Sequence, residues 1–411
     1  MSFQQGLSGL NAASKSLDVI GNNVANANTV GFKMSEAEFA DVFANSLNGS
    51  GGTQVGIGTT VRAVSQQFTQ GNITVTNNPL DIAINGKGFY RMSSNGAITY
   101  SRNGQFQLDK DGYVINSDKA RLTGYTVNAA GALDTSVPTE LRISSSDSMP
   151  SATTTVDATI NLDSRSQHLT PAFSVNDPDS YNNSTSAAVY DSLGNAHTLS
   201  LYFARRDPSV AGDENAWDVY GANDGTQIGA GAIGVLRFNG DGTLDTATST
   251  MPTVSGLAVT TGANPMSYTI DFAGTTQFGS AFGVNSLAQD GYTSGRLSGL
   301  SVSADGIIQG RYTNGQSATL GQVTLANFAN TQNLQPAGGN SWAETAESGA
   351  ALIGAPGSGT LGVLQSAAVE DSNVDLTAEL VNMITAQRVY QANAQSIKTQ
   401  DAVLQTLVNL R

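Results

Sequence analysis

The chain has 411 residues, which is long enough for two or three compact domains. Its net charge of −14 argues against a nucleic-acid-binding groove, and its lack of cysteine excludes disulfides, thiolate nucleophiles and cysteine-ligated metals. Charged residues make up only 13%, glycine occupies 45 positions and histidine only 2, so the composition favours a structural protein over an enzyme.

The N-terminal segment predicts an amphipathic helix. Apolar and small residues recur from Phe3 to Val24 at alternating steps of four and three, which is the a/d spacing of a coiled coil. The asparagines from Asn22 to Asn28 and the glycine at Gly31 indicate that the helix ends there. The large apolar positions of this stripe are Leu7, Leu10, Leu17 and Val24.

Residues 34–76 are predicted to connect this helix to the first β domain. Glycines cluster between Gly49 and Gly58 and make parts of the segment adaptable. Two interpretations remain open at this point, namely a merely loose linker and a joint that allows movement.

The central part of the chain has the pattern of β-strands. Asn-Gly and Asp-Gly pairs, such as residues 85–86 and 241–242, supply the positive φ angles of tight hairpins, and alternating runs such as residues 198–203 flank them. Polar or turn-rich stretches at residues 144–150 and 288–296 indicate two boundaries. We therefore expect an inner β domain of residues 77–147 and 292–370, interrupted by an inserted outer β domain of residues 148–291.

The C-terminal segment predicts a second, longer helix. The same alternation continues from Leu376 to Val408, and a helix of roughly 35 residues is about 50 Å long. Ser372 or Asn373 is the expected N-cap, with Asp375 in the first turn. The apolar residues assigned to this stripe and its border are Leu376, Leu380, Met383, Ile384, Tyr390, Ile397, Leu404 and Leu407.

The two terminal stripes need a partner, because a lone helix cannot bury an apolar face. Either the helices pair with each other or with the β domains of the same chain, or helices from many subunits share one core. The expected fold is mainly β with terminal α-helices, in which nested discontinuous β domains are closed by an N- and C-terminal coiled-coil-like helix pair. Residues 1–33 and 371–411 form the terminal helical domain in this prediction.

Both ends of the chain resemble the terminal signatures of the bacterial flagellar axial proteins, the rod and hook family. The N-terminal match consists of residues 8–13 (SGLNAA), 17–26 (LDVIGNNVAN) and 31–33 (GFK). The C-terminal match consists of residues 372–376 (SNVDL), 379–384 (ELVNMI), 387–388 (QR) and 390–394 (YQANA). Interior segments resemble the β domain shared by rod and hook proteins: residues 79–89, 100–106, 320–323, 325–328 and 340–342.

The whole chain is most similar to the hook branch of this family, because rod members share the ends but usually lack a large insertion. The resemblance implies a structural subunit that self-assembles into a short curved tube, joins rod to filament and transmits torque as a universal joint in swimming motility. The segment 34–76 would then let subunits shift as the tube bends. A distal rod subunit is the alternative within the family.

The resemblance also implies partners and a location. The implied partners are further copies of the chain, the rod and hook–filament junction proteins, a hook cap protein and the flagellar type III export apparatus. The subunit would lie in the hook outside the cell, attached to the basal body. The first residues lack the basic and apolar regions of a signal peptide, and no run of about 18 apolar residues occurs, so we expect export without a cleaved signal and no membrane insertion.

The stripes of the two helices are expected to face each other in the polymer core.

A secreted β-rich adhesin or enzyme is the less favoured class. Residues 239–245 faintly resemble a calcium loop but depart from the EF-hand spacing, and Asp177 with Asp179 suggests turn residues rather than a glycosidase pair. His197 lies at a predicted strand edge. We therefore expect no catalytic, cofactor-binding or metal-binding residues and no enzyme activity.

Overall fold

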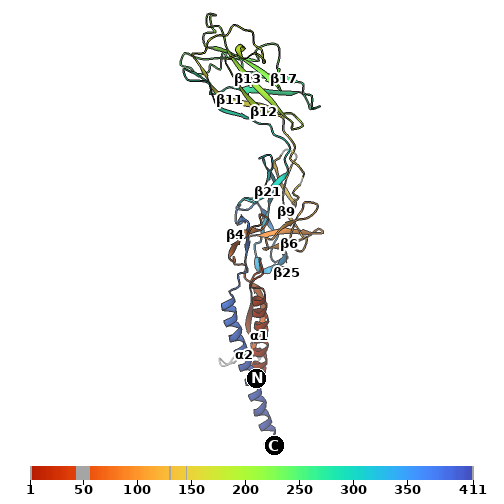
Figure 1. Cartoon of the computed structure of the whole chain (residues 1–411). Helices are drawn as coiled ribbons and strands as arrows, with labels where there is room; N and C mark the ends of the chain where they lie inside the picture. Colours follow the sequence, from red (N-terminus) through yellow and green to blue (C-terminus); the bar gives the residue numbers. More distant parts are fainter. Residues whose placement is uncertain (1, 43–55, 129–130, 145, 410–411) are drawn as a thin grey trace. The chain divides into compact units, whose positions relative to one another are not determined.

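The computed structural model describes residues 2–42, 56–128, 131–144 and 146–409, with side chains of residues 2 and 407–409 outside the description. The chain divides into two compact units (Figure 1). Unit 1 comprises Met1–Ser145, Gly299–Arg311 and Ser317–Arg411, and unit 2 comprises Ser146–Ser298 and Tyr312–Gln316. One unit is thus inserted in the sequence of the other. The finer domain boundaries given above stay a prediction.

Long helices occupy the two ends of the chain, as predicted. Helix α1 spans Ser2–Ala25 and helix α2 spans Leu376–Asn409, which is 34 residues. The predicted N-cap of α2 is wrong by two or three residues. The carboxylate of Asp375 caps the helix by accepting hydrogen bonds from the backbone N–H groups of Thr377 (2.9 Å) and Ala378 (3.1 Å). Asn373 is unable to cap, because its side chain bonds other segments of unit 1.

The connecting segment contains a hairpin of β1 (Ser35–Val42) and β2 (Gly58–Gln66), which pair antiparallel. This hairpin lies along α1. Gln5 Nε2 donates to the Gly56 carbonyl oxygen (2.6 Å), and Asn23 exchanges hydrogen bonds with the backbone of Ser35 (2.8 and 2.9 Å). The described part of the segment is therefore packed on the helix and is not a loose linker. Most of the glycine cluster, including Gly49, falls outside the described residues.

The strands before and after the insertion build the β part of unit 1. They are β3 (Ile73–Val75), β4 (Ile82–Asn85), β5 (Phe89–Ser94), β6 (Ala97–Ser101), β7 (Gln107–Leu108), β8 (Val114–Ile115), β9 (Arg121–Val127), β10 (Leu133–Glu140), β21 (Leu297–Val302), β22 (Ile307–Tyr312), β23 (Ser317–Val323), β24 (Leu325–Asn327), β25 (Gln335–Gly338), β26 (Ser341–Ala343), β27 (Leu352–Gly354), β28 (Val363–Ser366) and β29 (Ala368–Glu370). The main sheet has the order β21-β22-β23-β9-β5-β6-β26-β25.

Pairing across long sequence distances closes unit 1. Strand β28 pairs with β4 and β29 pairs with β3, so the chain that leads into α2 lies beside the chain that follows the hairpin. The interior contains edge-to-face aromatic contacts, in which Phe89 and Phe68 each lie within 6 Å of Trp342. The two halves of the inner β region therefore share one core.

Unit 2 is a sandwich of two sheets. Its strands are β11 (Thr155–Asp163), β12 (Asn183–Tyr190), β13 (Ala196–Arg205), β14 (Ala216–Asn223), β15 (Thr226–Gln227), β16 (Gly234–Arg237), β17 (Thr253–Leu257), β18 (Met266–Asp271), β19 (Thr276–Phe278) and β20 (Gly283–Gln289). One sheet contains β17-β18-β11-β19 with β20, and the other contains β12-β13-β14-β15 with β16. Alternate residues of β13 and β18 point inward, so Leu201 and Ile270 share a core with Trp217.

Candidate assembly interface and the junction beside it

Helices α1 and α2 contact each other along a row of small and polar residues. At one end, Asn23 Nδ2 donates to Glu379 Oε2 (3.2 Å). Toward the other end, a methyl group placed on Gly9 would lie 2.8 Å from the Asn393 side chain, so the two backbones approach closely there. Residue numbers fall along α2 as they rise along α1, so the helices run antiparallel (Figure 1).

The large side chains of the predicted apolar stripes stay exposed or half-buried within one chain, although Ile397 lies against Gly6 of α1. Six of the predicted residues are between 38% and 54% exposed: Leu7, Leu376, Leu380, Ile384, Tyr390 and Leu404. Five are half-buried: Leu10, Leu17, Val24, Met383 and Ile397. The side chain of Leu407 lies outside the described residues. As contacts between chains, these residues stay a prediction.

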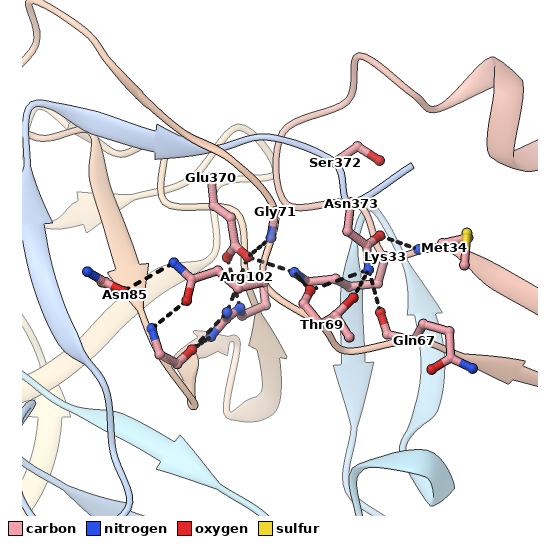
Figure 2. Close-up of polar contacts among 12 residues, drawn as sticks. Lys33, Met34, Gln67, Thr69, Gly71, Asn85, Arg102, Glu370, Ser372 and Asn373 are labelled. Carbon is pink, nitrogen blue, oxygen red and sulfur yellow. Dashed lines mark hydrogen bonds and ion pairs between the residues drawn. The ribbon is translucent and has the colours of Figure 1, made fainter. Parts of the chain in front are cut away.

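Four chain segments cross where the helices join the β part of unit 1. They are residues 31–34 after α1, 67–71 after β2, 101–104 after β6 and 370–373 before α2 (Figure 2). The carboxylate of Glu370 lies at the centre of this junction and is completely buried. Because residues from both ends of the chain meet here, the junction fixes the helix pair to the β-strands.

The junction holds two cations around one carboxylate. Lys33 Nζ lies 2.7 Å from Glu370 Oε1, and Arg102 Nε lies 2.9 Å from Glu370 Oε2 (Figure 2). Backbone carbonyl groups accept further hydrogen bonds from both cations, from Lys33 at Thr69 (2.7 Å) and from Arg102 at Gly88 (2.6 Å). Burial lowers the pKa of Lys33, Glu370 opposes this effect and Arg102 adds to it.

Close backbone crossings at the junction require glycine. A Cβ atom on Gly104 would overlap the carbonyl oxygen of Ile82, and one on Gly71 would overlap that of Asp371. Gly31 has a φ of +72° and donates its N–H to the Glu370 carbonyl oxygen (2.8 Å). These glycines let four segments pass close enough to share the buried charges.

Lys33 and Arg102 lie in segments that resemble the family, but the sequence did not predict that they surround a buried carboxylate. The signal available was that charged residues are scarce in this chain. The ion pair between Arg102 and Glu370 could not be predicted from local sequence, because the two residues lie 268 positions apart.

The other singled-out residues of unit 2 have local roles. Asp177 caps the short 3-10 helix Pro178–Ser180 by accepting from the N–H of Asp179 (3.1 Å). Asp241 accepts hydrogen bonds from the backbone and hydroxyl of Thr243, two residues on in the same turn. Both observations agree with the prediction that these carboxylates are turn residues.

His197 lies on β13 between two carboxylates. Its Nδ1 atom is 2.7 Å from Asp224 Oδ2 and its Nε2 atom is 3.3 Å from Asp191 Oδ2. The hydrogen bond with Asp224 raises the pKa of His197 against the opposing effect of burial. Burial alone would raise the pKa of Asp191, but hydrogen bonds from Asn195 and Thr261 lower it. The arrangement ties three loops of unit 2 together around the imidazole of His197.

No group of three or more histidine, aspartate or glutamate side chains is placed to hold a metal ion within the described residues. In the same part of the chain, no helix is long and apolar enough to cross a membrane.

Family models match most of the chain. The model described as flagella basal body rod protein matches residues 3–33, and that of the flagellar hook protein FlgE/F/G D1 domain matches residues 83–167. The flagellar basal body protein FlaE D2 domain matches residues 161–292, and the flagellar basal body rod FlgEFG protein C-terminal model matches residues 365–410.

Relatives match over the full chain. The flagellar hook protein FlgE of Escherichia coli K12 is 44% identical and that of Treponema pallidum 31%, with 100% of this chain and at least 99% of theirs aligned. The crystal structure of Helicobacter pylori flagellar hook protein FlgE2 has a similar fold, with a TM-score of 0.52 and 13% identity over 72% of this chain and 99% of its own. The chain therefore belongs to the flagellar hook protein FlgE family.

Proposed function

We propose that this structural subunit of the flagellar hook polymerises through the apolar stripes of its terminal helices. The resulting curved tube joins rod to filament and transmits torque as a universal joint. The single observation that carries the proposal is the row of large apolar side chains that the helix pair leaves exposed, with Leu380 at 45%, Ile384 at 51% and Leu404 at 54%. Soluble monomers rarely expose such a row of apolar side chains, whereas a polymer buries it between subunits.

Burial of this row on assembly contributes favourable free energy. Full burial of one leucine or isoleucine side chain is worth about 1.5–3 kcal/mol, and each is already about half covered. Five or six such side chains on one subunit therefore contribute about 5 kcal/mol before entropy costs. The small-residue row closes the helix pair within the chain, and so leaves the apolar row free for neighbours.

The proposal extends to partners and location. We propose contacts with the rod, the hook–filament junction proteins and the hook cap protein, and export through the flagellar type III apparatus without a cleaved signal peptide. We also propose that the subunit has no enzymatic activity. In support, the Thr261 hydroxyl near His197 donates to Asp191 (2.7 Å) rather than to the imidazole, so the histidine has no hydroxyl nucleophile in this contact.

The test substitutes one exposed leucine of the stripe. Leu380→Asp places a charge in the proposed core, and we expect it to abolish tubes in negative-stain electron microscopy under high-salt polymerising conditions. Leu352→Asp is a matched control, because Leu352 is an exposed leucine on β27 (63%). Gln391→Asp controls for a new charge at an exposed position of α2.

The outcomes separate the alternatives. Both controls should form curved tubes, while Leu380→Asp stays monomeric with an unchanged near-UV circular dichroism spectrum. Normal tubes from Leu380→Asp would contradict the stripe as the polymer core. Straight tubes from the unmodified chain would favour a rod subunit.

A further inference from the structure

We infer that the C-terminal end of α2 from one subunit docks into a groove over α1 of a second copy of this chain. We call residues 398–409, the C-terminal end of α2, the overhang, because their later part continues α2 past the N-terminal end of α1. The inference rests on the proposed function, since it specifies which two surfaces meet when subunits polymerise.

The groove has a volume of about 650 Å³ and lies between the hairpin and α2. Its floor is one face of α1, formed by Gly9, Ala12, Ala13, Ser16, Val19, Ile20 and Asn23. Phe39 and Ala37 of β1 line one side, and Ala386 and Val389 of α2 line the other. Because Gly9, Ala12, Ala13 and Ser16 of this floor carry small side chains, the groove leaves room for large apolar side chains of another helix.

The overhang supplies such side chains. Gly6, in the second turn of α1, lies against Ile397, so α2 passes the end of its partner helix about one turn farther on (Figure 1). Among the described side chains from Lys398 to Thr406, all but that of Gln400 are exposed. Val403 and Leu404 are 50% and 54% exposed. These apolar side chains have no cover in the monomer.

The lengths of the two surfaces agree, and one cation of the overhang complements the carboxylates of the groove. The floor from Gly9 to Asn23 is about 21 Å long, and the helical overhang is about 17 Å long at 1.5 Å per residue. The groove carries the carboxylates of Glu36 and Glu379, whereas the overhang begins with Lys398. Asp401, the opposite charge on the overhang, accepts a hydrogen bond from Gln405 (3.1 Å).

The occupant has to come from another copy. Since Gly9 lies opposite Asn393, Ser16 lies opposite Ala386 in the same chain, and Leu404 is then about 27 Å farther along α2. Groove and overhang are different surfaces of the subunit. Each subunit therefore inserts its overhang into the groove of one neighbour and accepts the overhang of another neighbour in its own groove. Such a heterologous contact generates an open helical polymer when its rotation does not close a ring. This is the assembly that a tube requires.

Because the chain has no cysteine, paired cysteines give a clean test. An overhang centred in the groove places Leu404 near Ser16. The variant S16C/L404C should therefore form disulfides between subunits in preformed tubes, seen as a ladder on a non-reducing gel. A disulfide requires Cα atoms within about 7 Å, so the pair cannot close within one chain. The matched control is D18C/L404C, because Asp18 lies at a similar height on the exposed face of α1.

We expect the ladder from S16C/L404C tubes to be at least tenfold stronger than that from the control. Equal ladders, or no ladder from well-formed tubes, would overturn the docking while leaving the proposed function intact. If the unmodified chain forms no tubes, the proposed function itself fails.

A second pair of variants tests whether the overhang docks in the groove if cysteine substitution prevents assembly. Ser16→Trp fills the groove and should raise the critical concentration for polymerisation at least tenfold, whereas Asp18→Trp should leave it within twofold of the unmodified chain. Circular dichroism of both monomers checks that α1 has formed. Normal assembly of Ser16→Trp, or equal impairment of both variants, would count against the groove.

Discussion

Glu370→Gln at the junction tests how the helix pair is held to the β part of unit 1. The substitution keeps the shape of the side chain and removes the only carboxylate in contact with Lys33 and Arg102 among the described ion pairs. The side chains of Lys33 and Glu370 are fully buried and that of Arg102 is 4% exposed. The variant therefore leaves two buried cations without a counter-charge.

Removing one partner of a buried ion pair costs about 3–5 kcal/mol. A domain of this kind has a total unfolding free energy of about 5–15 kcal/mol, so the loss is a large fraction of it. Burial already lowers the pKa of Lys33, and loss of Glu370 removes the effect that opposes this lowering. Lys33 can then lose its proton more easily, so the destabilisation should shrink as the pH rises.

The two tryptophans allow each unit to be followed separately. Trp342 is buried in unit 1 and Trp217 in unit 2, so Trp217→Phe leaves a fluorescent reporter for unit 1. In that background, Glu370→Gln should lower the urea midpoint of unit 1 by about 1–1.5 M, given a slope of about 3 kcal/mol per M. A variant that retains only Trp217 should show no shift from the same substitution.

Glu344→Gln is the control, because Glu344 is an exposed carboxylate of the same unit that accepts a hydrogen bond from Tyr100 (3.0 Å). We expect it to cost less than about 1 kcal/mol. The junction argument would be refuted if Glu370→Gln cost no more than this control, or if its cost grew between about pH 7 and about pH 9.

Three further predictions concern local features. Hydrogen bonding to Asp224 raises the pKa of His197 above 6.5. The contribution of protonated His197 to the stability of unit 2 is therefore complete below about pH 6.5 and is lost as the pH rises through the raised pKa. The unfolding midpoint of unit 2 should therefore fall between about pH 6 and about pH 9, and the same fall in His197→Gln would contradict the assignment. Gly104→Ala should destabilise unit 1 by more than about 3 kcal/mol because of its backbone overlap, whereas Gly21→Ala, with open space at its Cβ, should stabilise α1 by about 0.5–1 kcal/mol in denaturant titrations. Asp375→Ala removes the N-cap of α2 and should cost about 1 kcal/mol, with faster hydrogen exchange confined to the first turn; unchanged exchange there would argue against the cap.

Local pattern was sufficient for much of the fold. The heptad spacing predicted both terminal helices, because an apolar repeat of three and four residues has only one regular backbone that places it on one side. Alternation over residues 198–203 predicted the strand now seen as β13, and Asp241-Gly242 predicted a turn in which Gly242 has a φ of +83°. In each case the decisive contacts lie within a few residues of sequence.

Periodicity alone leaves open which of two rows on one helix contacts the other helix of the same chain. On α1, the row of Leu7 and Leu10 lies beside the row of Gly6 and Gly9, and both have the coiled-coil spacing. The apolar row suggested the stronger contact, but the glycine row closes the helix pair because it lets the backbones approach closely. Nothing in a single helix tells which row its partner will meet.

The sequence by itself therefore determined the helices, most of the strand and turn pattern and the family, since all of these are recorded in local spacing or in motifs. The tertiary structure decided which helix row is closed, how the hairpin packs on α1, and that Lys33, Arg102 and Glu370 share one buried site. The reason is physical. A buried charge is strongly destabilising unless an opposite charge lies beside it. Here the partners come from segments far apart in the sequence, so only the tertiary structure brings them together.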